Sequence, residues 1–249
     1  MTQKDKPLCY IDTHAGAGGY RLASHDERPH ESAAGIARLW QAGDLPDAVA
    51  AYVRQVKAFN HSPQLHFYPG SPWLARQCLR PADRLFLAEL HSSDVRLLRD
   101  HCKSDKRVRV FHQDGLQLLL SLLPPAERRA LVLIDPSYEI KSDYPQVCDT
   151  LVKAWRRFAG GCYALWYPVV DRSRIRRMEN TLKQSPLRNC LLLELGVRPD
   201  NDPGMTASGM IIINPPWQMA DTMQQVLPYL AAQLAGDNGF YRIEWLAGE

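Results

Sequence analysis

Residues 131–138 read LVLIDPSY, and this stretch decides the fold. Four apolar, mostly branched residues run directly into an acid, which is typical of a strand buried on both faces of a parallel sheet. Pro136 lacks the backbone N–H that would extend the strand, so we expect the strand to stop there. Ligands of open α/β sheets bind at the carboxyl ends of the strands. Asp135 and Tyr138 are therefore expected to lie at a binding site.

The order Asp135-Pro136-x-Tyr138 suits one particular chemistry. The amino group of adenine is a poor nucleophile because its lone pair is delocalised into the ring. The Asp135 carboxylate and the Pro136 carbonyl can each accept one amine hydrogen, and the Tyr138 ring can stack on the base, in the manner in which a flipped-out base is held. As a short pattern, the stretch is equally compatible with an ordinary strand end followed by a turn.

Length and composition bound the class of protein. The chain has 249 residues, a formal net charge of +3 and 45% hydrophobic residues, which fits one large α/β domain or two small ones. No apolar run approaches the ~20 residues that span a bilayer, and the polar start of the chain does not resemble a signal peptide. The six cysteines and eight histidines show no metal-binding or redox spacing. We therefore expect a cytoplasmic protein without a metal site.

The N-terminal part opens like a nucleotide-binding unit. A short strand at 8–12 runs into the glycine-rich turn at 13–20, where Gly16 lets the backbone approach a ligand closely. The last glycine of the dinucleotide fingerprint is replaced by Arg21, which disfavours NAD and leaves a smaller adenosine ligand open.

Two further strands end close to acids. The strand at 84–90 carries Glu89 at its end, where a carboxylate can accept both ribose hydroxyls of a bound adenosine. The strand at 108–111 is followed by Asp114 and Gly115, from which a carboxylate could reach the adenine edge of the same ligand. For Glu89, a role in capping a helix is the alternative.

Residues 20–81 form an insertion between the first two strands. Apolar residues recur at helical spacing over 35–41 and 45–59, and a turn then feeds a helix with Ser71 as its N-cap and Pro72 at its first position. The segment exceeds an ordinary connection, so we expect a helical subdomain that acts as a lid or substrate platform within a single domain spanning 1–249.

The second half of the chain adds strands at 162–167, 191–197 and 209–214, followed by a helix at 219–234. The short loop between the last two strands implies an antiparallel hairpin, whereas the earlier strands alternate with helices and should be parallel. We therefore expect a mostly parallel seven-stranded sheet with an antiparallel seventh strand, and residues 240–246 as a candidate edge strand.

A basic run covers residues 172–188. Such a run can hold a phosphate backbone, and a solvated helix face is the alternative interpretation.

A second tetrad, NPPW at 214–217, competes with the first. An amide oxygen can also accept an amine hydrogen, so Asn214 is chemically suitable. Its position argues against it, because an antiparallel strand presents its end at the opposite edge of the sheet. We favour a proline-stiffened strand exit with a packed Trp217.

Six motifs resemble a known family over nearly the whole chain. They are DTHAGAG at 12–18, PGSP at 69–72, ELH at 89–91, LIDP at 133–136, YALWYP at 163–168 and GMTASGM at 204–210. Together they resemble the bacterial RlmJ-type ribosomal RNA adenine-N6 methyltransferases.

The resemblance implies a Rossmann-like class I methyltransferase that uses S-adenosylmethionine to methylate the N6 amine of one adenine in 23S ribosomal RNA. It implies that Asp135 orients the adenine amine, which agrees with the roles expected above for Asp135, the Pro136 carbonyl and the Tyr138 ring. It implies cofactor contacts at the positions that match the family, which are His14, Ser71, Glu89, Asp114, Gly115 and Asp135. Gly16 of the glycine-rich turn completes the expected cofactor-binding set. The expected enzyme is a cytoplasmic monomer acting on naked or early-assembly RNA, with no membrane partner.

Two departures from the family pattern matter. The family usually carries a His-rich segment before the first strand, whereas here the strand follows Met1 within a few residues. The family motif has a second proline where this chain has Ser137, which restores a backbone donor and loosens the loop. We expect Ser137 alone to weaken activity at most.

The sequence leaves three rival functions. The same tetrad serves DNA adenine methylation, and members of the family have been linked to use of external DNA. The two departures also fit a catalytically impaired RNA-binding or assembly factor. A nicotinamide oxidoreductase is disfavoured by Arg21.

Overall fold

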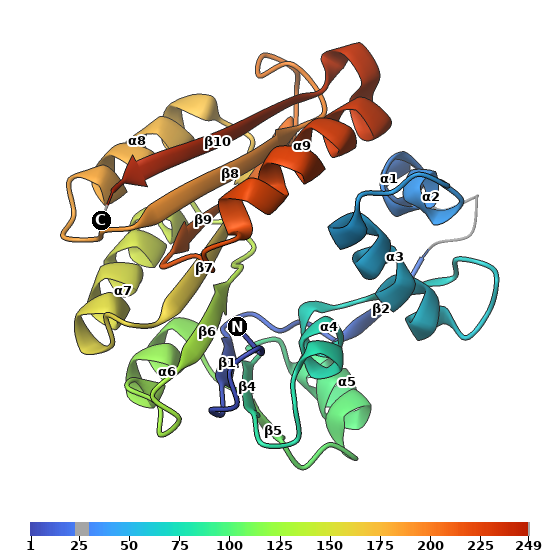
Figure 1. Cartoon of the computed structure of the whole chain (residues 1–249). Coiled ribbons are helices and arrows are strands. Elements are labelled where there is room, and N and C mark those ends of the chain that lie inside the picture. The colour runs from blue at the N-terminus through green and yellow to red at the C-terminus, as the bar shows by residue number, and fades with distance from the viewer. Residues whose placement is uncertain (23–29, 249) are drawn as a thin grey trace.

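A computed structural model describes residues 1–22 and 30–248 of the chain. One mixed sheet crosses the molecule, and helices cover both of its faces (Figure 1). This arrangement confirms the predicted α/β class with a mostly parallel sheet.

The main sheet has eight strands rather than the predicted seven, in the order β10-β8-β9-β7-β6-β1-β4-β5. They are β1 (Cys9–Asp12), β4 (Arg84–Ala88), β5 (Val108–Phe111), β6 (Ala130–Ile134), β7 (Cys162–Val169), β8 (Cys190–Gly196), β9 (Ala207–Ile213) and β10 (Phe240–Ala247). Five strands are parallel neighbours, in the order β7-β6-β1-β4-β5. The strand β9 is antiparallel to both β7 and β8. The extra strand is β10, which pairs with β8 along its length and makes the candidate edge strand a full member of the sheet.

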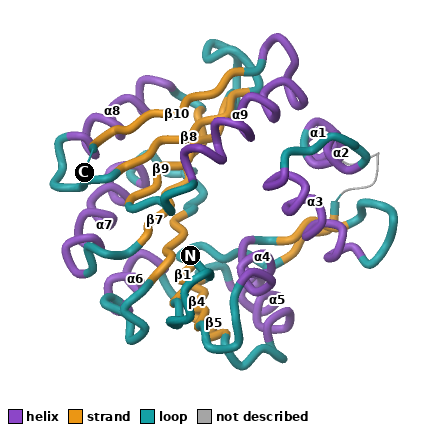
Figure 2. Tube along the Cα trace, viewed as in Figure 1, coloured by secondary structure: helices purple, strands orange, loops and turns teal. Residues whose placement is uncertain are grey.

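The helices divide between the two faces of the sheet, as Figure 2 shows. One face is covered by α6 (Gly115–Leu122), α7 (Asp143–Arg157) and α8 (Arg172–Lys183). The other carries α4 (Ser71–Cys78), α5 (Ser92–Cys102) and α9 (Met219–Ala235), which ends in the short helix η1 (Gly236–Asn238). Strands therefore have to be apolar on both sides, which explains the continuous apolar run at 131–134.

The strand β6 lies in the middle of the sheet and is buried unequally on its two sides. Val132 and Ile134 are fully buried against the helices of one face. Leu131 and Leu133 are only half-buried, because they line an apolar groove of about 480 Å³ between α4 and α9. The sequence pattern predicts burial on both faces, and the groove accounts for the difference.

The insertion at 20–81 is helical in part and also contains a small sheet that the sequence did not indicate. Its elements are α1 (His30–Ala34), α2 (Ile36–Trp40), α3 (Asp47–Asn60), α4 and the two antiparallel strands β2 (Gly19–Arg21) and β3 (Phe67–Pro69). Val49, Val53 and Val56 of α3 form an apolar cluster with Val226 of α9. The insertion is thus anchored to the last helix of the sheet domain.

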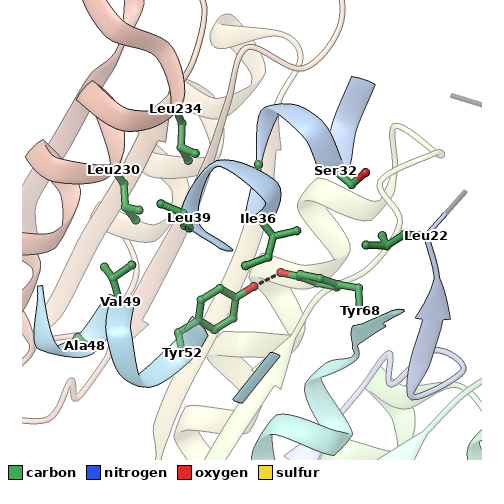
Figure 3. Close-up of a pocket in the computed structure, with 11 residues that line it drawn as sticks. Leu22, Ser32, Ile36, Leu39, Ala48, Val49, Tyr52, Tyr68, Leu230 and Leu234 are labelled. Atoms are coloured by element: carbon green, nitrogen blue, oxygen red, sulfur yellow. Dashed lines mark hydrogen bonds between the residues drawn. The ribbon is translucent and has the colours of Figure 1, made fainter. Parts of the chain in front are cut away.

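A pocket of about 500 Å³ lies between the insertion and α9 (Figure 3). Its walls are mainly aliphatic side chains from α2, α3 and α9, and the hydroxyls of Tyr52 and Tyr68 are hydrogen-bonded to each other across it. None of the predicted site residues lines this pocket.

The first residue of the basic run belongs to a buried charge network rather than to a free surface. Arg172 donates to the fully buried Glu194 (Nη1 to Oε2, 2.8 Å) and to Asp200 (Nε to Oδ2, 2.7 Å). Glu194 also accepts from the Tyr167 hydroxyl at 3.0 Å and lies 3.4 Å from Arg242. Arg172 is therefore not available to hold a phosphate, which corrects the prediction for this position.

Candidate active site

Four acids lie at the edge of the sheet where the parallel strands end. Asp12 closes β1, Glu89 follows β4, Asp114 follows β5 and Asp135 follows β6. These strands are adjacent in the order β6-β1-β4-β5, so their carboxyl ends form one continuous edge. The adjacency of these strands therefore brings the predicted acids Glu89, Asp114 and Asp135 to the edge where ligands of such sheets bind.

Asp12 lies at the centre of this edge, although its place in the sequence pattern predicted no individual role for it. It is fully buried and accepts hydrogen bonds from the hydroxyls of Tyr10 (2.9 Å) and Ser71 (2.7 Å). Burial raises the pKa of Asp12 despite these donors. An acid ending the first strand directly before a glycine-rich turn was the signal that could have identified it.

His14 sits on the turn that follows Asp12. Its backbone N–H donates to Asp12 Oδ1 at 3.3 Å, and its ring Nδ1 shares a 2.7 Å hydrogen bond with the Thr13 hydroxyl. Burial lowers the pKa of His14, which keeps the ring neutral at pH 7. His14 therefore contributes hydrogen-bonding capacity rather than charge.

Ser71 does not cap α4, and that part of the prediction was wrong. The N-cap is Gly70, and Ser71 is already the first residue of the helix. Gly70 lies directly against Gly18, since its N–H donates to the Gly18 carbonyl at 3.1 Å. A Cβ at this position would lie only 3.0 Å from the Gly18 backbone. The Ser71 hydroxyl is left free to reach Asp12 instead.

Glu89 is held by backbone donors on both of its oxygens. The Gly16 N–H donates to Oε2 at 2.8 Å and the His91 N–H to Oε1 at 2.7 Å. Gly16 has φ +61°, a conformation that favours glycine. The carboxylate is thereby oriented, and each oxygen keeps a further lone pair for a ligand.

Asp114 and Gly115 start α6. One oxygen of Asp114, Oδ1, caps the helix by accepting the Gln117 N–H at 2.9 Å. A Cβ on Gly115 would lie 1.8 Å from the Thr13 carbonyl oxygen, so α6 begins in direct contact with the turn after β1. Only glycine allows this approach.

We expect Gly115→Ala to destabilise the fold by about 1–3 kcal/mol, because the added methyl forces the turn at Thr13 and the start of α6 apart. Chemical denaturation measures the change. Gly160→Ala is the matched control, since nothing lies within 4 Å of its Cβ position, and it should change stability by less than about 0.5 kcal/mol. Equal effects of the two substitutions would contradict the packing argument.

Asp135 is open to solvent on one side and surrounded by protein on the other. Desolvation by that protein raises the pKa of Asp135 to about 6, and the nearby charge of Asp12 adds to the effect. Pro136 is buried behind it. The carboxylate therefore sits at the edge with its charged form disfavoured in the free protein.

Tyr138 occupies a strained backbone position, with φ +55° for a bulky side chain. Its hydroxyl donates to the Trp166 carbonyl at 2.6 Å, and its ring lies 4.6 Å from the ring of Tyr144. Only 8% of the residue is exposed. The ring is thus fixed at the end of the motif by packing and one hydrogen bond.

The rival tetrad at 214–217 lies at the opposite edge of the sheet. Because β9 is antiparallel, Asn214 follows it where the parallel strands begin, and its amide donates to the carbonyls of Ala159 (2.7 Å) and Gly161 (2.8 Å) ahead of β7. Trp217 is 80% exposed, so the packed Trp that we expected there was wrong. Asn214 is a structural residue far from the four acids along the strand direction.

Within residues 1–22 and 30–248, no group of three or more His, Cys, Asp or Glu side chains is arranged to hold a metal ion. No helix of the described chain is long and apolar enough to cross a membrane.

A family model described as "Ribosomal RNA large subunit methyltransferase D, RlmJ" matches residues 5–247. Two proteins named "Ribosomal RNA large subunit methyltransferase J" are similar along the chain. The one from Escherichia coli K12 is 51% identical over 252 residues (100% of this chain, 90% of that protein). The one from Haemophilus influenzae is 46% identical over 250 residues (99% and 89%).

A crystal structure of a Legionella pneumophila protein shares the fold with a TM-score of 0.91 and 36% identity, covering 98% of this chain and 90% of that one.

Proposed function

Because the chain belongs to the RlmJ family of large-subunit ribosomal RNA methyltransferases, we propose that it methylates the exocyclic N6 amine of an adenine in 23S ribosomal RNA, with S-adenosylmethionine as donor. The observation that carries the proposal is the position of Asp135. It ends β6 beside the acids of β1, β4 and β5, and the Pro136 carbonyl and Tyr138 follow it directly.

The donor set at this edge fits the proposed cofactor. S-adenosylmethionine carries a sulfonium and an ammonium charge, and Asp12, Glu89, Asp114 and Asp135 make the edge acidic. A cation among these carboxylates would relieve the repulsion that Asp12 exerts on Asp135. Glu89 would accept the ribose hydroxyls.

The second oxygen of Asp114 would accept the adenine amine of the cofactor. Gly16 and Gly115 would let the backbone lie close to the cofactor, and Gly115 is itself packed on Thr13. His14 and Ser71 would supply hydrogen bonds from uncharged groups.

The residues of this chain would act by positioning and charge stabilisation. The bound cofactor supplies an electrophilic methyl group. Asp135 and the Pro136 carbonyl would each accept one hydrogen of the target amine and turn its lone pair toward that methyl. The Tyr138 ring, only 8% of which is exposed, would support the motif from behind and border the base with that exposed part. As the bond from sulfur to the methyl carbon broke, positive charge would pass from the sulfonium to the amine, and the Asp135 carboxylate would stabilise it. The thioether would leave neutral, and the surplus amine proton would pass to solvent. No covalent bond to the enzyme is needed.

The same proposal includes the wider setting of the reaction. One domain over 1–249 would act as a monomer in the cytoplasm, with 20–81 as a platform beside the site. The substrate would be naked or early-assembly RNA, in which a single adenine can be extruded without opening a finished subunit.

Methyl transfer from labelled S-adenosylmethionine to an unmodified large-subunit ribosomal RNA transcript tests the proposal, with DNA of the same sequence in parallel. Transfer to RNA at N6 of adenine is the expected result. Preferential transfer to DNA would favour the DNA-methylating rival. RNA binding without transfer to either substrate would favour the assembly-factor rival.

The pH dependence of kcat/KM provides a second test. Asp135 accepts the amine hydrogen only when it is ionised, and in the free enzyme its pKa is raised to about 6. We expect kcat/KM to fall about tenfold for each pH unit below about 6 and to level off above about 7. Asp135→Asn should have lower activity, and its kcat/KM should not show this fall at acid pH. The same acid limb in both proteins would assign it to another group.

A further inference from the structure

A basic groove runs between α7 and α8 on the face of the sheet opposite α9. Its volume is about 460 Å³. It is lined by Lys141, Tyr144, Pro145, Cys148, Arg174, Arg177, Met178 and Thr181. Three of these side chains are cationic and none is acidic, so the lining is suited to an anion.

The three cations differ in how far they are already engaged. The Arg174 guanidinium lies 5.2 Å from the centre of the Tyr144 ring, and its Nη2 lies 3.7 Å from Asp171. Lys141 and Arg177 are exposed, and neither forms an ion pair with any residue that the structure describes. Their charges therefore remain available to a ligand.

The groove adjoins the motif that follows β6, and the Tyr144 ring separates the two. Lys141 lies on the loop that leaves Tyr138, and Tyr144 forms part of the groove wall. The other side of this wall is the motif itself, since the rings of Tyr138 and Tyr144 are 4.6 Å apart. A strand that placed a base at Asp135 would therefore pass next to the groove.

We propose that this groove binds a backbone phosphate of the RNA beside the target nucleotide, with Lys141 and Arg177 as the contacting charges. The inference rests on the proposed function and names the substrate contact of the same site. Phosphates are the usual partners of Lys and Arg in nucleic-acid complexes, and these contacts fix where the strand lies. Arg174, whose guanidinium lies over the buried Tyr144 ring, adds a third positive charge to the same wall.

The proposal divides the basic run at 172–188 by function. Arg172 is committed to Glu194 and Asp200. Arg176 faces a different depression, where Glu179 and Asp200 also lie. Arg177, one position further along α8, turns into the groove. Adjacent arginines on one helix thus have opposite surroundings, which supplies a matched pair of variants.

The test compares Arg177→Glu with Arg176→Glu in the full chain. Both reverse one exposed charge on the same helix, so their effects on net charge are identical. Binding to the unmodified ribosomal RNA transcript is measured over a range of salt concentrations, with S-adenosylmethionine affinity as an internal control. We expect Arg177→Glu to weaken RNA binding by about tenfold and to lower the salt slope by about 1, with cofactor affinity unchanged. Arg176→Glu should stay within about twofold of the parent protein.

Equal loss in both variants would overturn the proposal, because it would show a general charge effect. Unchanged RNA binding by Arg177→Glu would overturn it as well. Lys141→Glu provides a second route to the same groove from a loop rather than a helix, and it should reproduce the Arg177→Glu result. Binding is scored independently of methyl transfer, so failure of the proposed reaction and failure of the groove are distinguishable.

Discussion

Asp135→Ala is expected to lower kcat for RNA methylation by roughly 100- to 1000-fold, the usual effect of removing one preorganised charge-stabilising group. The substitution removes the carboxylate that accepts an amine hydrogen and stabilises the developing positive charge. Methyl transfer under single-turnover conditions measures the loss. Thermal stability should not fall, because Asp135 is a partly desolvated acid whose charge is disfavoured by Asp12. A variant with normal transfer would remove Asp135 from the mechanism.

Two matched substitutions sharpen this result. Asp135→Asn keeps an oxygen that can accept the amine hydrogen and loses the charge, so its rate should lie between those of the parent and Asp135→Ala. Trp217→Ala alters the exposed aromatic residue of the rival tetrad at the opposite edge. It should leave transfer unchanged, and a loss comparable with that of Asp135→Ala would move the reaction to that tetrad.

Glu194→Ala is expected to destabilise the folded protein by about 3–5 kcal/mol, the range found when one partner of a buried ion pair is removed. Glu194 is fully buried and faces Arg172, 13% exposed at its side chain, and Arg242, 25% exposed. Without it, the Tyr167 hydroxyl loses its acceptor and Arg172 loses the partner that balances its charge inside the fold. Guanidinium denaturation at pH 7 measures the change in unfolding free energy.

Glu244 supplies the control, because it pairs with the same Arg242 at the surface. Its side chain is 47% exposed and lies 2.8 Å from the arginine. Glu244→Ala should cost less than about 1 kcal/mol, since an exposed pair is screened by water. If both alanine variants lost the same stability, burial would not be the source of the effect.

The edge that carries the site was predictable because it depends on strand order and on residues next to strand ends. The run at 131–134 and its terminal Asp135 placed β6, and the acids at Glu89 and Asp114 marked the ends of its neighbours. Parallel strands then bring these residues together without further information. The antiparallel hairpin of β8 and β9 followed from its short loop.

The parts that failed depend on contacts between distant segments. Ser71 has a side chain suited to an N-cap, but Gly70 fits against Gly18 and takes that position, which no local pattern reveals. Arg172 belongs to a basic run, and only the fold shows that Glu194 lies beside it. Trp217 was expected to pack, and its exposure depends on how the chain leaves β9. Local propensity is overridden in each case by tertiary neighbours.

The position of β9 has a consequence for how the protein is made. β9 lies between β7 and β8, and β10 covers the far side of β8, so both neighbours of β8 are synthesised after it. While translation proceeds past residue 196, the apolar strand β8 has no partner and β7 offers an open edge. β7 is paired with β6 from the start, whereas β8 gains its first partner, and β7 its second, only when β9 has emerged from the ribosome. The outer side of β8 stays open until β10 follows. Removal of the last strands would therefore yield an aggregating product rather than a shorter enzyme.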